Sequence, residues 1–93
     1  MVELHNQKLR DAILKVVKKQ LADQDPPETK ETFERLQQEG FSAEASMKMI
    51  GFVIAAEVFS IYKDDRPYEK ERFVRKLKAL PHLPWEAKDG ENY

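Results

Sequence analysis

Apolar side chains recur every three to four residues in four segments of the chain, and this period predicts four helices. The segments cover residues 2–22, 26–39, 43–63 and 67–80. Three of them carry one apolar stripe with charged residues opposite, as amphipathic helices do. The third segment is apolar over well over half of its circumference, which is typical of a helix at the centre of a fold or of an oligomer. We therefore expect an all-α protein, a compact bundle of about four helices whose third helix is central and very apolar.

Residues that start and stop helices stand at the predicted boundaries. Asp25 and Glu28 have the spacing of a capping box at the start of the second helix. Gly40 can adopt the left-handed backbone conformation that ends this helix. Ser42 is a typical N-cap for the third helix. The connections are therefore short, and short connections favour packing between neighbouring helices.

The composition narrows the class of protein. A chain of 93 residues suits one domain, which we place at residues 1–87, with a disordered tail at 88–93. Because the chain has no cysteine, disulfides, thiolate metal sites and cysteine nucleophiles are excluded. Charges interrupt the apolar third segment, and the N-terminus lacks the apolar core of a signal peptide. We interpret the chain as a cytoplasmic protein that does not span a membrane.

The net charge is only −1, but the two signs are segregated along the chain. Residues 1–22 carry five basic and two acidic side chains, and residues 66–78 carry six and two. Residues 23–46 carry seven acidic side chains and two basic ones. This segregation favours attraction between helices, within one fold or across a dimer. Nucleic acid is a disfavoured partner, because the basic segments lack aromatic residues and the chain as a whole is not basic.

The most apolar stretch of the chain, MIGFVIAAEVF at residues 49–59, contains one carboxylate, Glu57. On a helical wheel Glu57 falls opposite Lys48, in the middle of the apolar side. A half-buried carboxylate usually pairs with a cation, and Arg10 and Arg72 are the candidate partners. The functional alternative is a carboxylate that transfers a proton or binds a metal ion.

The third helix also has a narrow side suited to close packing. Gly51 and Ala55, four residues apart, would let another backbone approach, either the first helix or a second copy of the chain. A 93-residue chain has little surface with which to cover so apolar a helix, so we favour a homodimer. The residues that we expect in its interface or in the core are Met49, Ile50, Val53, Ile54, Glu57 and Ile61.

The sequence contains no phosphate-binding loop, paired-histidine zinc motif, nucleophile elbow or calcium loop. The leading hypothesis is therefore a non-catalytic helical domain for protein–protein interaction or a structural role, without cofactor or metal. It would self-associate, and any further protein partner stays unidentified. The alternative is a metal-binding protein or a vestigial metal-dependent enzyme that uses Glu44, Glu57 and His5.

Three motifs within residues 14–81, DPPE, ERLQQEG and RPYEKERFVRKL, are similar to those of a known family. On these motifs the chain resembles small bacterial all-helical proteins of unknown function. In that family, two histidines four apart on the first helix and an HEAIH segment at the start of the third suggest a metal site. The matching positions here are Arg10, Leu14, Glu44 and Lys48. The resemblance thus implies a helical member that has lost the metal, with an Arg10–Glu44 ion pair in its place, and it implies no activity.

Overall fold

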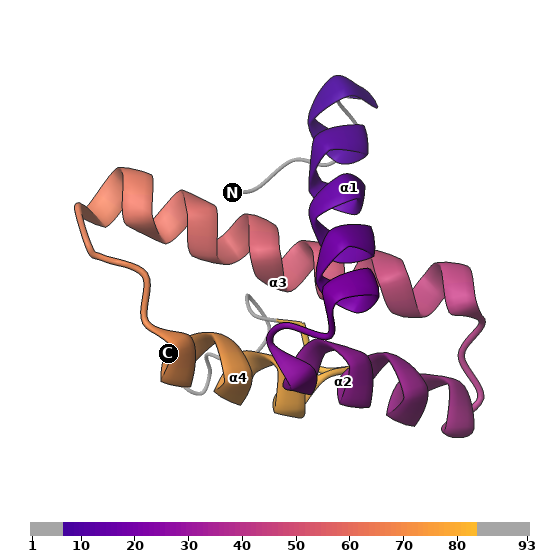
Figure 1. Cartoon of the computed structure of the whole chain (residues 1–93). Coiled ribbons are helices and arrows are strands. Elements are labelled where there is room, and N and C mark those ends of the chain that lie inside the picture. Colours follow the sequence, from indigo (N-terminus) through magenta and orange to yellow (C-terminus); the bar gives the residue numbers. More distant parts are fainter. Residues whose placement is uncertain (1–6, 84–93) are drawn as a thin grey trace.

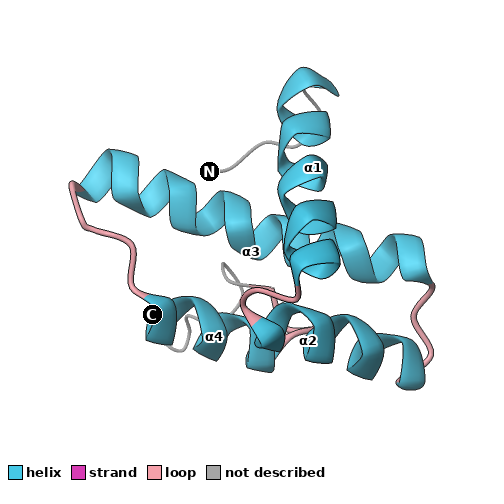
Figure 2. Cartoon of the chain, viewed as in Figure 1, coloured by secondary structure: helices cyan, strands magenta, loops and turns pink. Residues whose placement is uncertain are grey.

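The structure is a computed structural model that describes residues 7–83. These residues form four helices: α1 (Gln7–Asp23), α2 (Pro27–Gln38), α3 (Ala43–Asp64) and α4 (Lys70–Ala79). The described range contains no strand (Figure 2). The predicted all-α class is confirmed. The predicted domain limits at residues 1–87, and the predicted tail, lie partly outside the described residues.

Helix α3 is the helix around which the others are arranged. It contacts α1, α2 and α4, and α2 contacts both α1 and α4. In Figure 1, α1 crosses the middle of α3 steeply, while α2 and α4 lie along one side of it, α4 near its C-terminal half. The prediction of a central third helix is therefore confirmed.

Local signals end α2 and start α3 as predicted. Gly40 has a φ of 107°, and its N–H donates to the carbonyl of Gln37 at 3.0 Å. The N–H of Phe41 donates to the carbonyl of Leu36 at 3.1 Å. These two bonds form a Schellman motif, which satisfies carbonyls at the helix end. The Oγ of Ser42 then accepts a hydrogen bond from the N–H of Ala45, as an N-cap does.

Two predicted helix starts were wrong. No capping box forms in α2, because its N-cap is Pro26, which has no side-chain cap bond, and the N–H of Asp25 still bonds to the last turn of α1. Helix α4 begins at Lys70 and not near Pro67. The carbonyl of Pro67 instead accepts a hydrogen bond from the Arg72 side chain, so the segment before α4 is shaped by a tertiary contact.

The core lies where the four helices meet. Its buried apolar residues are Ile13, Val17, Leu36, Ile50, Val53, Ile54, Ala55, Phe73, Leu77 and Leu80. A Cβ placed on Gly51 would lie 3.2 Å from Cγ2 of Ile13, so α1 packs directly on the backbone of α3 at this point. The narrow side of α3 is thus occupied by α1 of the same chain. Of the two neighbours that the sequence left open at Gly51, the structure shows the first helix of the same chain, and self-association itself stays a prediction.

Helix α3 also meets the length and composition criteria of a candidate membrane span, the one helix within residues 7–83 that does. Core helices of soluble proteins meet the same criteria, and α3 is the helix on which the other three pack. The charged residues within α3 are therefore too few to exclude a membrane span on composition alone. The absence of a membrane span stays a prediction.

Candidate functional site

The carboxylate in the apolar helix is buried and bound by two cations. Glu57 is 3% exposed. The Nε of Arg72 donates to its Oε1 at 2.9 Å, and the Nζ of Lys76 donates to its Oε2 at 2.6 Å. Each carboxylate oxygen therefore accepts one charge-assisted hydrogen bond, the stronger class of hydrogen bond.

Helix α4 positions both cations. Arg72 and Lys76 are four residues apart, so they lie one turn apart on the same side of α4, the side that meets α3. Arg72 is 7% exposed, and its two terminal nitrogens have partners of their own. Nη1 donates to Oε1 of Glu69 at 3.1 Å, and Nη2 donates to the carbonyl of Pro67 at 3.3 Å. The guanidinium thus joins α3, α4 and the segment between them.

The two ion pairs hold helices α3 and α4 together, and they leave neither oxygen of Glu57 free to act on a substrate. A general base needs an oxygen that can take a proton from a substrate, and both oxygens of Glu57 are engaged by cations inside the protein. Of the two predicted partners, Arg72 is confirmed, and Arg10 is not a partner of this carboxylate. Lys76, the second partner, was not predicted. Its spacing of one turn from Arg72 was the signal that could have revealed it.

The metal-binding alternative does not assemble around Glu57. Glu44 and Glu57 are thirteen residues apart on one helix, an axial separation of about 20 Å at 1.5 Å per residue, so they cannot bind one ion. Glu44 lies 3.4 Å from the Nζ of Lys48. His5 lies outside the described residues. Within residues 7–83 no three His, Cys, Asp or Glu side chains lie together in a way that could hold a metal ion.

The residues predicted for the interface or core divide into two groups. Ile50, Val53, Ile54 and Glu57 are buried within the chain, as are the close-approach residues Gly51 and Ala55, whereas Met49 and Ile61 are half-buried. A role for any of them between copies of the chain stays a prediction. The ion pair between Arg10 and Glu44 implied by the resemblance is replaced by the pair of Glu44 with Lys48. Leu14, Glu44 and Lys48 do share one cavity, between α1 and the start of α3.

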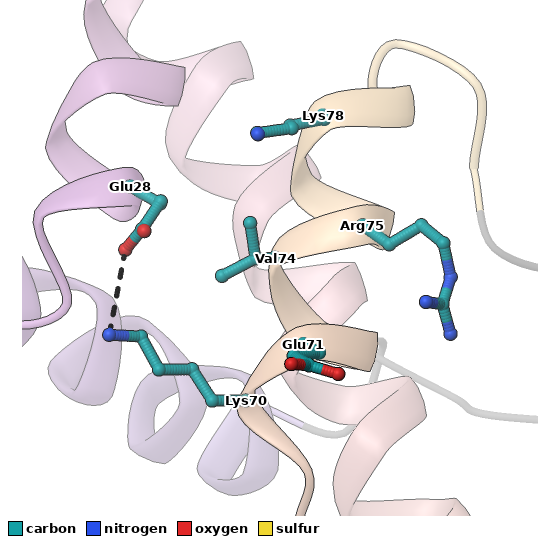
Figure 3. Close-up of a pocket in the computed structure, with 6 residues that line it drawn as sticks. All are labelled: Glu28, Lys70, Glu71, Val74, Arg75 and Lys78. Atoms are coloured by element: carbon teal, nitrogen blue, oxygen red, sulfur yellow. Dashed lines mark ion pairs between the residues drawn. The ribbon is translucent and has the colours of Figure 1, made fainter.

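A second cavity, of about 400 Å³, opens between α2 and α4 (Figure 3). Six residues line it: Glu28, Lys70, Glu71, Val74, Arg75 and Lys78. The Nζ of Lys70 is 4.0 Å from Oε1 of Glu28, too far for a hydrogen bond. Glu71 and Arg75 lie one turn apart on α4, but no ion pair joins them (Figure 3). Acidic and basic side chains are mixed on this wall, so it selects no charge class of ligand.

Tyr68 lies in the segment before α4, and its pKa is shifted by burial and by nearby carboxylates. Burial raises the pKa of its phenol above the usual value, and the negative charges of Glu57, Asp25 and Glu28 raise this pKa further. All four causes favour the neutral phenol. The hydroxyl is therefore a hydrogen-bond donor at neutral pH and not a nucleophile.

The other distinct feature is apolar surface left uncovered on α1 and α3. Within residues 7–83 the large exposed apolar side chains are Leu9 and Val16 on α1, Val58, Phe59 and Tyr62 on α3, and Tyr68 in the segment before α4. Tyr62 is 91% exposed and Val58 is 54% exposed. Leu9 and Val16 repeat with the buried Ile13 at helical spacing, so their exposure shows that the apolar stripe of α1 is only partly covered.

Comparisons with protein-family models, with curated proteins and with solved structures found no match to this chain. The expected membership of a bacterial helical family therefore stays a prediction.

Proposed function

We propose that this chain is a non-catalytic helical domain that acts by binding protein, in the first place a second copy of itself. One observation carries the proposal: near the C-terminal end of α3 three large apolar side chains are exposed, Val58 by 54%, Phe59 by 38% and Tyr62 by 91%. Soluble proteins rarely leave contiguous apolar surface uncovered unless it serves an interaction. A 93-residue chain is also short of surface with which to cover such a helix, and association supplies it.

The buried ion pairs support a structural role for the side of α3 that meets α4. Glu57 joins α3 to α4 through Arg72 and Lys76, so ion pairs add to the apolar contacts that hold α3 on α4. A helix held in this way can present its uncovered side to a partner without rearranging, which reduces the entropy cost of binding. We further propose a cytoplasmic location, since small domains without disulfides are typical of reducing compartments.

Sedimentation equilibrium of the full chain over a wide concentration range tests the proposal. We expect a concentration-dependent mass that reaches twice the mass of the chain. A single monomer mass at every concentration would refute self-association. Elemental analysis of protein purified without chelator is the companion measurement, because stoichiometric bound metal would contradict the non-catalytic, metal-free function.

A further inference from the structure

One side of α3 is apolar but carries none of the residues that this helix buries, and we call it the fourth side: Met49, Phe52 and Ala56. At about 100° per residue, the buried residues of α3 fall within about 200° of its circumference, and the fourth side lies outside that arc. Helix α1 meets the arc at Gly51, and α4 meets it at Glu57. The three residues of the fourth side are half-buried. Further cover there would be favourable, since removing apolar surface from water lowers the free energy.

The chain returns to the level of the fourth side at the end of α4. Figure 1 shows α4 running back alongside α3, towards its middle. Arg72 and Lys76 of α4 bind Glu57. Phe52 lies five residues before this carboxylate, about 7.5 Å along the axis of α3. Leu80, the C-cap of α4, lies four residues beyond Lys76, about 6 Å in the same direction, so the end of α4 is level with Phe52.

Leu83, the last residue that the structure describes, fixes the point from which the chain continues. It is half-buried and packs against the same core cluster as Met49, a residue of the fourth side. The next residue, Pro84, disfavours a helical backbone at Leu83 and favours an extended one. Trp85 follows two residues beyond Leu83, a span of at most about 7 Å in an extended chain. A large apolar side chain is thus tethered close to the fourth side.

We infer that residues 84–87, which lie outside the described part of the chain, form a strap across the fourth side, with the Trp85 indole on Phe52. An aromatic side chain buries about 150–250 Å² and pairs well with a second ring, so one tryptophan suits a side centred on a phenylalanine. The tether favours this occupant over a second copy, because a tethered segment does not lose the translational freedom of a separate molecule. The strap goes beyond the proposed self-association, and it removes Met49 and Phe52 from the surface offered to a partner.

Tryptophan fluorescence tests the strap directly, because Trp85 is the only tryptophan of the chain. We expect emission at a shorter wavelength, and slower quenching by acrylamide, than for the same chain unfolded in urea. Phe52→Lys should move both values to those of the unfolded chain. The control is Val58→Lys, which should change neither, because Val58 is 54% exposed and lies seven residues beyond Gly51, on the α1 side of the same helix. Far-UV circular dichroism verifies that each variant folds, and Phe52→Ala replaces Phe52→Lys if the lysine variant does not.

Two results at a single concentration would overturn the strap. One is wild-type emission and quenching equal to those of the unfolded chain. The other is a shielded tryptophan that the Phe52 variants leave unchanged, because Trp85 would then pack elsewhere.

The same measurement over the concentration range of the sedimentation experiment separates the strap from the proposed function. Shielding of Trp85 that is independent of concentration supports the strap, whether the chain is a monomer or a dimer. A monomer with shielded Trp85 would refute self-association and leave the strap standing. Shielding that appears only where the mass doubles would assign the contact to a second copy and overturn the strap.

Discussion

Replacement of Glu57 by glutamine should destabilise the fold by about 3 kcal/mol. Removing one partner of a buried ion pair typically costs about 3–5 kcal/mol, because the remaining charge is left uncompensated. The Arg72 side chain is 8% exposed, so it cannot replace the lost carboxylate with water. Arg72 does keep its hydrogen bonds to Glu69 and to the carbonyl of Pro67. The Lys76 side chain is 27% exposed and can turn towards solvent. These remaining partners place the cost at the lower end of the range.

Two further variants divide this cost between the cations. Lys76→Gln should cost only about 1 kcal/mol, since a bond to a charged group is worth about 1.5–3 kcal/mol when buried and less with access to water. Glu57→Leu combined with Arg72→Met should lie within about 1 kcal/mol of wild type, because apolar replacement of a buried pair is often neutral or stabilising. Glu69→Gln is the matched control, since this carboxylate is 61% exposed.

Urea unfolding followed by far-UV circular dichroism, at one fixed protein concentration, measures these free energies. We expect the loss of free energy of unfolding to be largest for Glu57→Gln, smaller for Lys76→Gln and smallest for Glu69→Gln. A loss for Glu57→Gln no larger than that for Glu69→Gln would refute the conclusion that the carboxylate is a buried tie.

Other predictions follow from single contacts. Gly51→Leu should cost about 1–3 kcal/mol in the same unfolding assay, because α1 leaves no room for a side chain; a loss equal to that of Ala56→Leu, at a half-buried position of the same helix, would contradict this. Ser42→Ala should cost about 1 kcal/mol through loss of the N-cap bond, measured as a lower thermal midpoint, and an unchanged midpoint would count against the cap. The phenolate absorbance of Tyr68, taken as wild type minus Tyr68→Phe, should titrate above the usual value of about 10, and Glu28→Gln should lower that midpoint. Because the folded pKa of this phenol is the higher one, its contribution to stability is complete below the unfolded value and is lost as the pH rises above it.

Local signals in the sequence were sufficient for the helix ends that depend on neighbouring residues alone. Gly40 and Ser42 act through hydrogen bonds that span no more than five residues, so their roles could be read without knowing the tertiary structure. The burial of Glu57 was also predictable, since the helical period alone places it on the apolar side of α3. The start of α4 was not, because Pro67 and Arg72 are held by a contact that depends on where Glu57 lies.

The uncovered surface could not be predicted because it depends on the angle between two helices. Val16 belongs to the same stripe as Ile13, and the sequence treats them alike. Ile13 and Val17 pack on α3 at Gly51 and are buried, whereas Val16, between them in the sequence, is 41% exposed, so it lies at the edge of the side that α3 covers. The steep crossing centres on Gly51, where α1 meets bare backbone. Periodicity identifies an apolar side but does not specify how much of it a neighbour covers.

The ion pairs of Glu57 also limit how α4 can lie on α3. The apolar residues of α4, Phe73, Leu77 and Leu80, repeat at helical spacing, so a shift of one turn along α3 would still bury apolar surface. That shift would carry Arg72 away from its carboxylate and leave a buried charge without a counterion. The pairs thus separate the native register in energy from its neighbours, even where they add little to total stability. The doubly apolar variant, Glu57→Leu with Arg72→Met, should therefore remain folded while α4 samples several alignments, visible as broadened amide resonances along that helix.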